Sequence, residues 1–284
     1  MTISPHSYPS PAALLRKHGM APRKSWGQNF LHDPEVHAGI VRASRAQPGD
    51  RVVEIGAGLG SLTVHLLGTG AEVWAVERDR DMCAVLRAEL GDQPNFTLHE
   101  ADAVKFDYAS TALGPERPAT IVGNLPYQLT GVLLFALLDA DLETGSWVVM
   151  VQREVADRLC SPPGSRQYGA ASATIGRVRT VTKVLDVGRG AFLPPPRVES
   201  AVIRLDRRQA PLGEVRDVTE FRRLVRVAFQ QRRKTLRNAL GPLGAKEEIR
   251  RWCEVADVDP RVRPEKLGPE QFAALQRARE ASDA

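Results

Sequence analysis

A glycine-rich segment and two acidic residues have the types and spacing of a nucleotide-binding site. The segment EIGAGLG (54–60) lies between an apolar run and a helical pattern, and its glycines allow a ligand to lie against the backbone at a helix start. These glycines are Gly56, Gly58 and Gly60. Glu77 ends the next apolar run, 17 residues past Gly60, where a carboxylate can accept both hydroxyls of a ribose. Asp102 ends a third run, placed to accept from an adenine amino group.

The spacing of the glycines indicates which cofactor is bound. A dinucleotide fingerprint needs its third glycine at position 61, where this chain has Ser61. The pattern is therefore GxGxG, and the chain has no evident hydride-transfer histidine or Tyr-Lys pair, so S-adenosylmethionine is favoured over a nicotinamide cofactor. Each acid alone could be a helix cap at a strand end, but ligand-type residues at three consecutive strand ends favour a binding site.

The tetrapeptide Asn124-Leu125-Pro126-Tyr127 follows a fourth strand-like run. Its Asn124 oxygen and Leu125 carbonyl can accept the two N6 hydrogens of adenine, in a conformation that Pro126 helps to fix. Tyr127 offers a face on which an extruded base can stack. The alternative is an ordinary turn, in which Asn, Pro and Tyr are common. Beside a methyl-donor pocket, however, the tetrapeptide predicts transfer of a methyl group to adenine N6, mainly by positioning.

Short strand-like runs alternate with helical segments after Asp50, which predicts an α/β fold with a mostly parallel sheet. The runs are RVVEIG (51–56), AEVWAVE (71–77), NFTLHEAD (95–102), ATIVGN (119–124) and SWVVMVQ (146–152). Two further runs, 181–188 and 199–206, are joined by a proline-rich segment and are expected to form an edge hairpin. Strand patterning ends at Asp206, so we expect a catalytic domain over 1–206 and a helical domain over 207–284.

Positive charge is concentrated in the expected helical domain. The chain has 39 Lys and Arg against 34 Asp and Glu, a net charge of +5. Residues 207–284 carry 18 basic and 12 acidic side chains, a net of +6, while residues 1–206 carry a net of −1. We expect contacts to RNA phosphates from Arg222, Arg223, Arg226, Arg232, Arg233, Lys234 and Arg237. A solvated helix face is the alternative for each of them, and Arg16, Lys17, Arg23 and Lys24 could extend the same surface.

The remaining composition excludes several classes of protein. No apolar stretch approaches the about 20 residues that cross a bilayer, and the N-terminus has no secretory pattern. The cysteines Cys83, Cys160 and Cys253 are far apart, as expected of reduced thiols in the cytoplasm. No metal site is expected, because the six histidines all occur by position 99 without a cysteine at ligand spacing.

With these motifs in place, the chain closely resembles the KsgA/RsmA family of ribosomal RNA adenine N6,N6-dimethyltransferases over nearly its full length. The resemblance is carried by GQNFLHD (27–33), EIGAGLG, Glu77, Asp102-Ala103, NLPY (124–127), VQREVADRL (151–159), PGSRQYG (163–169), FLPPPRVESAV (192–202) and FQQRRKTLRNAL (229–240). It implies a class I S-adenosylmethionine-dependent methyltransferase domain, with a Rossmann-like sheet of seven mostly parallel strands, followed by a small all-helical domain.

The resemblance also implies a substrate and a set of site residues. Members dimethylate two adjacent adenines in the 3′-terminal hairpin loop of small-subunit (16S) ribosomal RNA, within a late 30S assembly intermediate, and a monomer is expected. The implied cofactor contacts are Gln28, Asn29 and Leu31 from an N-terminal extension (1–48), together with Gly56, Glu77, Asp102 and Asn124. Phe192 matches the aromatic residue that sandwiches the target base opposite Tyr127.

Two other functions remain as alternatives. The related macrolide-resistance methylases share the fold and an NxPY-type motif but modify large-subunit RNA; the NLPY form, FLPPPRVES and RRKTLRNAL favour the small-subunit activity. An RNA-binding assembly or transcription factor with vestigial chemistry is the other alternative, and the intact acidic pair and NLPY argue against it.

Overall fold

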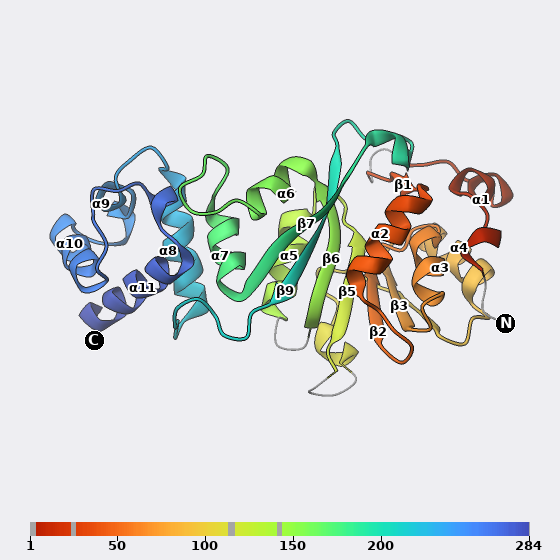
Figure 1. Ribbon diagram of the computed structural model, residues 1–284, viewed down its shortest axis with the longest axis horizontal. Helices are drawn as coiled ribbons and strands as arrows, with labels where there is room; N and C mark the ends of the chain where they lie inside the picture. Colours follow the sequence, from red (N-terminus) through yellow and green to blue (C-terminus); the bar gives the residue numbers. More distant parts are fainter. Residues whose placement is uncertain (1–3, 24–26, 113–116, 141–143, 284) are drawn as a thin grey trace. The chain divides into compact units, whose positions relative to one another are not determined.

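A computed structural model describes residues 4–23, 27–112, 117–140 and 144–283 (Figure 1). Lys24, one of the basic residues named above, lies outside these residues. By its internal contacts the chain forms two compact units, one of Met1–Ala156 with Thr182–Asp206 and one of Asp157–Val181 with Arg207–Ala284. The end of the first unit at Asp206 coincides with the expected boundary, but the second unit also includes residues 157–181, which the expected linear division assigned to the first.

The first unit is built on a seven-stranded sheet of order β4-β3-β2-β5-β6-β9-β7. Its first five strands in the chain pair in parallel, and β9 pairs antiparallel with β6. The strands are β2 (Arg51–Ile55), β3 (Glu72–Glu77), β4 (Phe96–Glu100), β5 (Ala119–Asn124), β6 (Thr144–Gln152), β7 (Arg179–Val187) and β9 (Ser200–Arg207). All seven expected strands are present, and the expected α/β fold with a mostly parallel sheet is confirmed.

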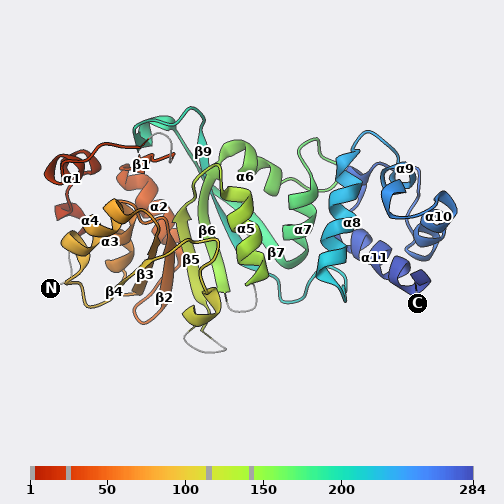
Figure 2. The ribbon, with the colours of Figure 1, turned by 180° about the vertical axis from the view of Figure 1, so that it is seen from behind.

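Helices cover both faces of this sheet. In Figure 1, α2 lies in front of the strands, and in the reverse view of Figure 2 α5 lies in front of them. The helices of this part of the chain are α1 (Pro11–Lys17), α2 (Pro34–Ser44), α3 (Ser61–Leu67), α4 (Arg80–Leu90), α5 (Thr130–Asp139) and α6 (Arg153–Leu159), with short 3-10 turns at Pro5–Ser7, Tyr108–Thr111 and Arg189–Ala191. Helix α1 begins after Ser10, whose hydroxyl caps it, and ends before Gly19 at a positive φ of 63°.

The core of the first unit lies between the sheet and these helices. The strand residues Val52, Val73, Val122 and Val148 are fully buried there with Leu66 and Leu86 of the helices. Strands buried on both faces need continuous apolar runs, as these have. A separate two-stranded sheet pairs β1 (Phe30–Leu31) with β8 (Phe192–Leu193), and so joins the N-terminal segment to the proline-rich one.

The second unit is helical. It contains α7 (Ala170–Val178), α8 (Val218–Gln230), α9 (Leu236–Ala239), α10 (Lys246–Val255) and α11 (Pro269–Asp283), with 3-10 turns at Gly241–Leu243 and Pro264–Lys266. Its core includes Phe221, Leu224 and Val225 of α8, which recur at helical spacing. In the part of the chain that the structure describes, no helix is long and apolar enough to cross a membrane.

The sequence RRKTLRNAL (232–240) has a helical pattern, but its first half is not helical. Only Leu236–Ala239 is helical, and Gln231–Thr235 forms a turn closed by the Lys234 N–H donating to the Gln231 carbonyl at 2.8 Å. The Leu236 N–H donates to the Val262 carbonyl at 2.7 Å instead of continuing α8. Long-range hydrogen bonding therefore overrides the helical pattern here.

Candidate functional site

A cavity of about 440 Å³ lies in the first unit. Its wall is formed by the loops that follow β2, β3, β4 and β5, where an open parallel sheet binds its ligand, together with the N-terminal segment 27–31 and α2. Of the expected site residues, those that line it are Gln28, Asn29, Leu31, Gly56, Gly58, Glu77, Asp102, Asn124, Leu125, Pro126 and Tyr127. Gly60 and Phe192 do not.

The glycine loop divides its glycines between two tasks. Gly56 and Gly58 line the cavity with φ of 73° and 56°, which a side chain would strain. Gly60 also has a positive φ, of 81°, but a Cβ there would lie 2.6 Å from the Tyr8 hydroxyl oxygen and 2.9 Å from a Leu90 methyl carbon. Gly60 therefore allows Tyr8 and Leu90 to pack closely against the loop. It does not line the cavity, contrary to the expectation.

Glu77 is held by the backbone around it. Its carboxylate accepts from the Gly58 N–H at 2.9 Å and from the Arg78 and Asp79 N–H groups at 2.8 Å each. Burial raises the pKa of Glu77, and these three hydrogen bonds oppose the rise. A carboxylate has about four acceptor positions, so one remains for a ligand hydroxyl. If Glu77 is to accept from two ribose hydroxyls, one of its acceptor positions must be shared between a hydroxyl and a backbone N–H.

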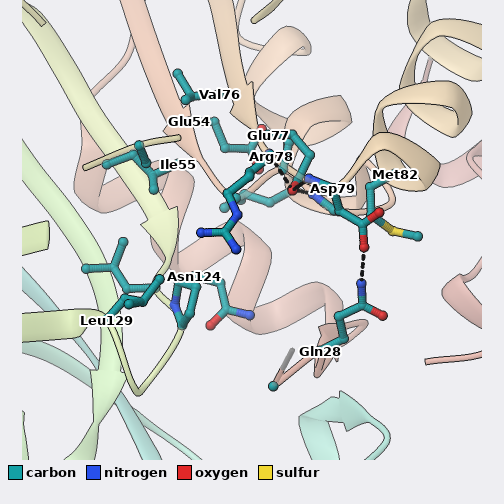
Figure 3. A pocket seen from close by; sticks show the side chains of 18 of the residues that line it. Gln28, Glu54, Ile55, Val76, Glu77, Arg78, Asp79, Met82, Asn124 and Leu129 are labelled. Atoms are coloured by element: carbon teal, nitrogen blue, oxygen red, sulfur yellow. Dashed lines mark hydrogen bonds between the residues drawn. The ribbon is translucent and has the colours of Figure 1, made fainter. Parts of the chain in front are cut away.

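Asp102 is also partly engaged. One carboxylate oxygen accepts from the Val104 N–H at 3.0 Å, which is the capping interaction considered as its alternative role. The other lies 3.5 Å from an Arg78 guanidinium nitrogen. Figure 3 shows the Arg78 side chain pointing across the cavity from the Glu77 side toward Asn124 and Leu129. Because more than half of the Arg78 side chain is exposed, it can move to admit a ligand.

Segment 27–31 is tied to the turn after β3. The Gln28 amide donates to an Asp79 carboxylate oxygen at 2.7 Å, the bond drawn in Figure 3. Asp79 is 4% exposed, and its other oxygen caps α4 through the Asp81 N–H at 3.0 Å. The sequence did not single out Asp79, because its partner Gln28 lies 51 residues away.

Asn124, at the end of β5, has a fixed orientation. Its side-chain nitrogen donates to the Asn29 carbonyl at 3.3 Å. The side-chain oxygen therefore remains as an acceptor. The next residue is fixed from the neighbouring strand, because the Leu125 N–H donates to the Met150 carbonyl of β6 at 3.1 Å. The tetrapeptide is therefore a rigid wall of the cavity with an amide oxygen available.

Tyr127 is positioned by a residue that the sequence did not single out. Its hydroxyl lies 2.5 Å from the hydroxyl of Ser200, which is fully buried at the start of β9. Ser200 belongs to FLPPPRVES, so the only signal for it was the family motif. Phe192, from the same motif, differs from expectation: it is 2% exposed and packs in the core with Leu31 and Val202. A base cannot stack on Phe192 in this arrangement, because its ring is covered by apolar side chains.

Glu54, from the glycine-rich segment, is a buried carboxyl in the cavity wall. It is 2% exposed, and the Thr63 hydroxyl donates to it at 2.6 Å. Burial raises the pKa of Glu54 to about 7, with Glu77 contributing and the Thr63 hydrogen bond opposing. Sequence reasoning gave it no role, although an acid within the apolar run RVVEI is a signal of a functional carboxyl.

The expected RNA-contacting residues of the second unit differ in their surroundings. Arg226, Arg233, Lys234 and Arg237 are exposed. Arg223 lies 3.3 Å from Glu220, and Arg222 is half-buried. Arg232 donates to the Arg166 carbonyl at 2.9 Å and lies 3.2 Å from Glu265. Two of the N-terminal basic residues are paired within the first unit, Lys17 with Glu89 and Arg23 with Asp79 and Asp81.

Two solved structures with a similar fold are methyltransferases. A dimethyladenosine transferase from Plasmodium falciparum matches with a TM-score of 0.70 and 26% identity, over 87% of this chain and 95% of that one. The 23S rRNA methyltransferase ErmE matches with a TM-score of 0.67 and 25% identity, over 89% of this chain and 100% of that one. The fold and the cavity at the strand ends are those of a class I methyltransferase.

Sequence comparison gives the family. The family model for ribosomal RNA adenine dimethylase matches residues 19–278. Ribosomal RNA small subunit methyltransferase A from Anaeromyxobacter sp. (strain K) is 48% identical over 95% of this chain and 98% of that protein. The protein of the same name from Pseudomonas aeruginosa is 44% identical over 89% and 92%. This chain belongs to the ribosomal RNA adenine dimethylase family, as its motifs predict.

Proposed function

We propose that this protein transfers methyl groups from S-adenosylmethionine to N6 of two adjacent adenines in the 3′-terminal hairpin loop of 16S ribosomal RNA, within a 30S assembly intermediate in the cytoplasm. The observation that carries the proposal is the orientation of Asn124. Its nitrogen donates to the Asn29 carbonyl, which leaves its oxygen as an acceptor for an amino group, and Asn124 lines the cavity. Membership of the adenine dimethylase family supports the same substrate.

The residues present fit the proposed methyl donor. A cavity of about 440 Å³ is within the range of about 300 to 1,000 Å³ of small-molecule sites. Glu77 has an acceptor position for a ribose hydroxyl, and Asp102 can accept from an adenine amino group once Arg78 moves. Gln28, Asn29, Leu31, Gly56 and Gly58 would form the remaining contacts. When bound, S-adenosylmethionine supplies a methyl group on a positively charged sulfur.

The chain's own residues would position the target amine. The lone pair of adenine N6 is delocalised into the ring, so the amine must be oriented by acceptors. The Asn124 oxygen and the Leu125 carbonyl would hold its two hydrogens, while Tyr127 stacks on the base, its ring fixed by Ser200. Positive charge develops on N6 as the new bond forms, and both acceptors stabilise it more strongly at that point. The amine loses its proton to water as the bond completes, so no general base is required.

The nearest rival activity is methylation of 23S ribosomal RNA, which the likeness to ErmE favours. The higher identity to small-subunit enzymes, 48% against 25%, favours 16S RNA. The test is to incubate the protein and methyl-labelled S-adenosylmethionine with undermethylated 30S particles and, separately, with 50S particles. We expect label in 16S RNA of the 30S particles alone. Label in 23S RNA, or none in either, would overturn the proposal.

A further inference from the structure

The first turn of α5 presents apolar side chains to solvent beside the cavity. Leu129, the N-cap residue, lines the cavity and is 36% exposed, and Val132 is 51% exposed. In Figure 3, Leu129 lies on the same side of the cavity as Asn124. Gly131 is also exposed, and a Cβ there would meet no atom within 4 Å. Leu129, Gly131 and Val132 together are named the α5 surface.

The packing of α5 does not account for this surface. The helix packs into the core through a different face, which consists of the buried residues Leu133, Leu134, Leu137 and Leu138. Leu129 and Val132 are three residues apart and therefore neighbours on the helix surface. Single exposed apolar side chains are common in proteins, but two neighbouring ones that continue the wall of a cavity indicate a contact with a ligand.

Hydrogen bonds to one carbonyl fix the α5 surface beside the tetrapeptide. The Leu129 N–H donates to the Pro126 carbonyl at 2.9 Å, and the Thr130 hydroxyl donates to the same carbonyl at 3.2 Å. Leu129 is two residues past Tyr127, so their Cα atoms are at most about 7 Å apart. Tyr127 is the residue on which the target base would stack. The α5 surface is therefore close enough to contact the nucleotide that adjoins the target.

The charges around Tyr127 favour a nucleotide as the ligand. The first turn of α5 contains no acidic residue. Arg197 is exposed three residues before Ser200, the partner of Tyr127, and Glu199 between them is paired with Arg153. Apolar side chains suit the face of a base, and an exposed arginine suits a phosphate. A stable protein partner would need an interface of about 1,200 Å² or more, far larger than these three residues.

We propose that the α5 surface binds the base next to the target adenine, so that one of the two adjacent adenines packs on Leu129 and Val132 while the other is methylated. The inference rests on the proposed function, since it takes the adenine pair as the substrate. Stabilisation by apolar contact grows with the area buried, and a purine is larger than a pyrimidine. The α5 surface therefore favours a target adenine whose neighbour is also a purine.

The test measures the coupling between the α5 surface and the neighbouring base. The proteins are wild type, the double variant Leu129→Ser with Val132→Ser, and the control Val184→Ser, which changes a valine of β7 that is 39% exposed. Serine is favoured at the N-cap position that Leu129 occupies, so the helix is retained. The substrates are undermethylated 30S particles with both adenines, and particles with either adenine replaced by uridine. Mass spectrometry gives the initial methylation rate at each remaining adenine, at limiting particle concentration.

With both adenines present, the double variant should be about fivefold slower than wild type, and Val184→Ser should match wild type. Calorimetry should show the same affinity for S-adenosylmethionine in all three proteins within about twofold. On at least one of the two uridine particles wild type should itself be slower, and there the double variant should lose less than about twofold more, because the contact it lacks is already absent.

Three results would each overturn the inference: no loss in the double variant on natural particles, an equal loss on all three particles, or a matching loss of affinity for S-adenosylmethionine. The second would mean that the α5 surface contacts something other than the neighbouring base, and the third would mean a role in holding the methyl donor. The proposed function is tested separately, since it fails only if wild type leaves the natural particles unmethylated.

Discussion

The polar side chains of the cavity in the first unit are held by hydrogen bonds, whereas those of the basic turn in the second unit (Gln231–Thr235) are partly exposed to solvent. In the cavity, Gln28 is bonded to Asp79, Asn124 to Asn29, and Glu77 to three backbone N–H groups. In the turn after α8, Arg233 and Lys234 are exposed. A small ligand is recognised by groups fixed in advance, whereas phosphates are attracted by charge without fixed geometry. The two regions therefore suit two different kinds of recognition.

Arg232 shows that the contrast also exists within one short segment. It is bonded to the Arg166 carbonyl and paired with Glu265, and thereby connects the loop at 163–169 to the turn at 264–266. Its neighbour Arg233 is exposed. We infer that Arg232 mainly stabilises the second unit, while Arg233 and Lys234 remain available to RNA.

The largest expected effect comes from the fixed cavity. Asn124→Ala removes the proposed N6 acceptor, so methylation of 30S particles should fall about 100- to 1,000-fold, as for loss of one positioned group in other enzymes. Binding of S-adenosylmethionine should weaken less than about tenfold, because Glu77 and Asp102 remain. Both are measured by initial rates and calorimetry on one preparation. Near-normal methylation would contradict the role of Asn124.

The buried carboxyl of Glu54 should make stability depend on pH. Its pKa is about 7 in the folded protein and about 4.3 in an unfolded chain. Between these values the unfolded state binds fewer protons, so the free energy of unfolding falls as pH rises and levels off above about pH 7. Relative to Glu54→Gln, wild type should lose about 3 kcal/mol across this range. Urea unfolding at several pH values measures both proteins; parallel pH profiles would show that Glu54 titrates normally.

Tyr127 allows its ring and its hydroxyl to be separated. Tyr127→Ala should reduce methylation about 5- to 100-fold, since stacking on a base contributes about 1–3 kcal/mol. Tyr127→Phe keeps the ring and loses only the bond to Ser200, so a reduction of a few-fold is expected, equal to that of Ser200→Ala. The rates with 30S particles test this. If Tyr127→Phe were as impaired as Tyr127→Ala, the hydroxyl rather than the ring would be the functional group.

The smallest effect is expected from the exposed basic pair. Arg233→Ala with Lys234→Ala should reduce the salt dependence of 30S binding by a slope of about 2, one for each phosphate contact, without changing the free energy of unfolding. Arg250→Ala is the matched control, because Arg250 is exposed on α10 but paired with Glu247 and Glu254. Arg232→Ala should instead lower the free energy of unfolding by about 1 kcal/mol. An unchanged slope in the double variant would remove this pair from the RNA surface.

The strands and most helices were predictable because their signals are local. A continuous apolar run such as WVVMV is typical of a strand in a covered parallel sheet, and the spacing in α8 gives one apolar face. The break at Gln231–Thr235 was not predictable, since it depends on the Val262 carbonyl and on Arg166 and Glu265. The inclusion of residues 157–181 in the second unit depends in the same way on packing between distant segments.

In the site, too, the features with local sequence signals were predictable and the long-range contacts were not. The glycines and acids at strand ends could be located from the sequence because βαβ topology brings those ends together. The neighbours that decide what each residue does could not: Tyr8 below Gly60, Asp79 beside Gln28, Ser200 beside Tyr127, and the apolar cover over Phe192.

The central claim is that the protein methylates an adenine amine of small-subunit RNA that is held in the cavity of the first unit. The most direct measurement is nuclease digestion and mass spectrometry of 16S RNA from undermethylated 30S particles treated with wild type and S-adenosylmethionine, with Asn124→Ala treated in parallel. We predict two methyl groups on N6 of each of two adjacent adenines near the 3′ end, and neither in the Asn124→Ala sample. Methylation at another atom or another site, or an equal product from Asn124→Ala, would contradict the account.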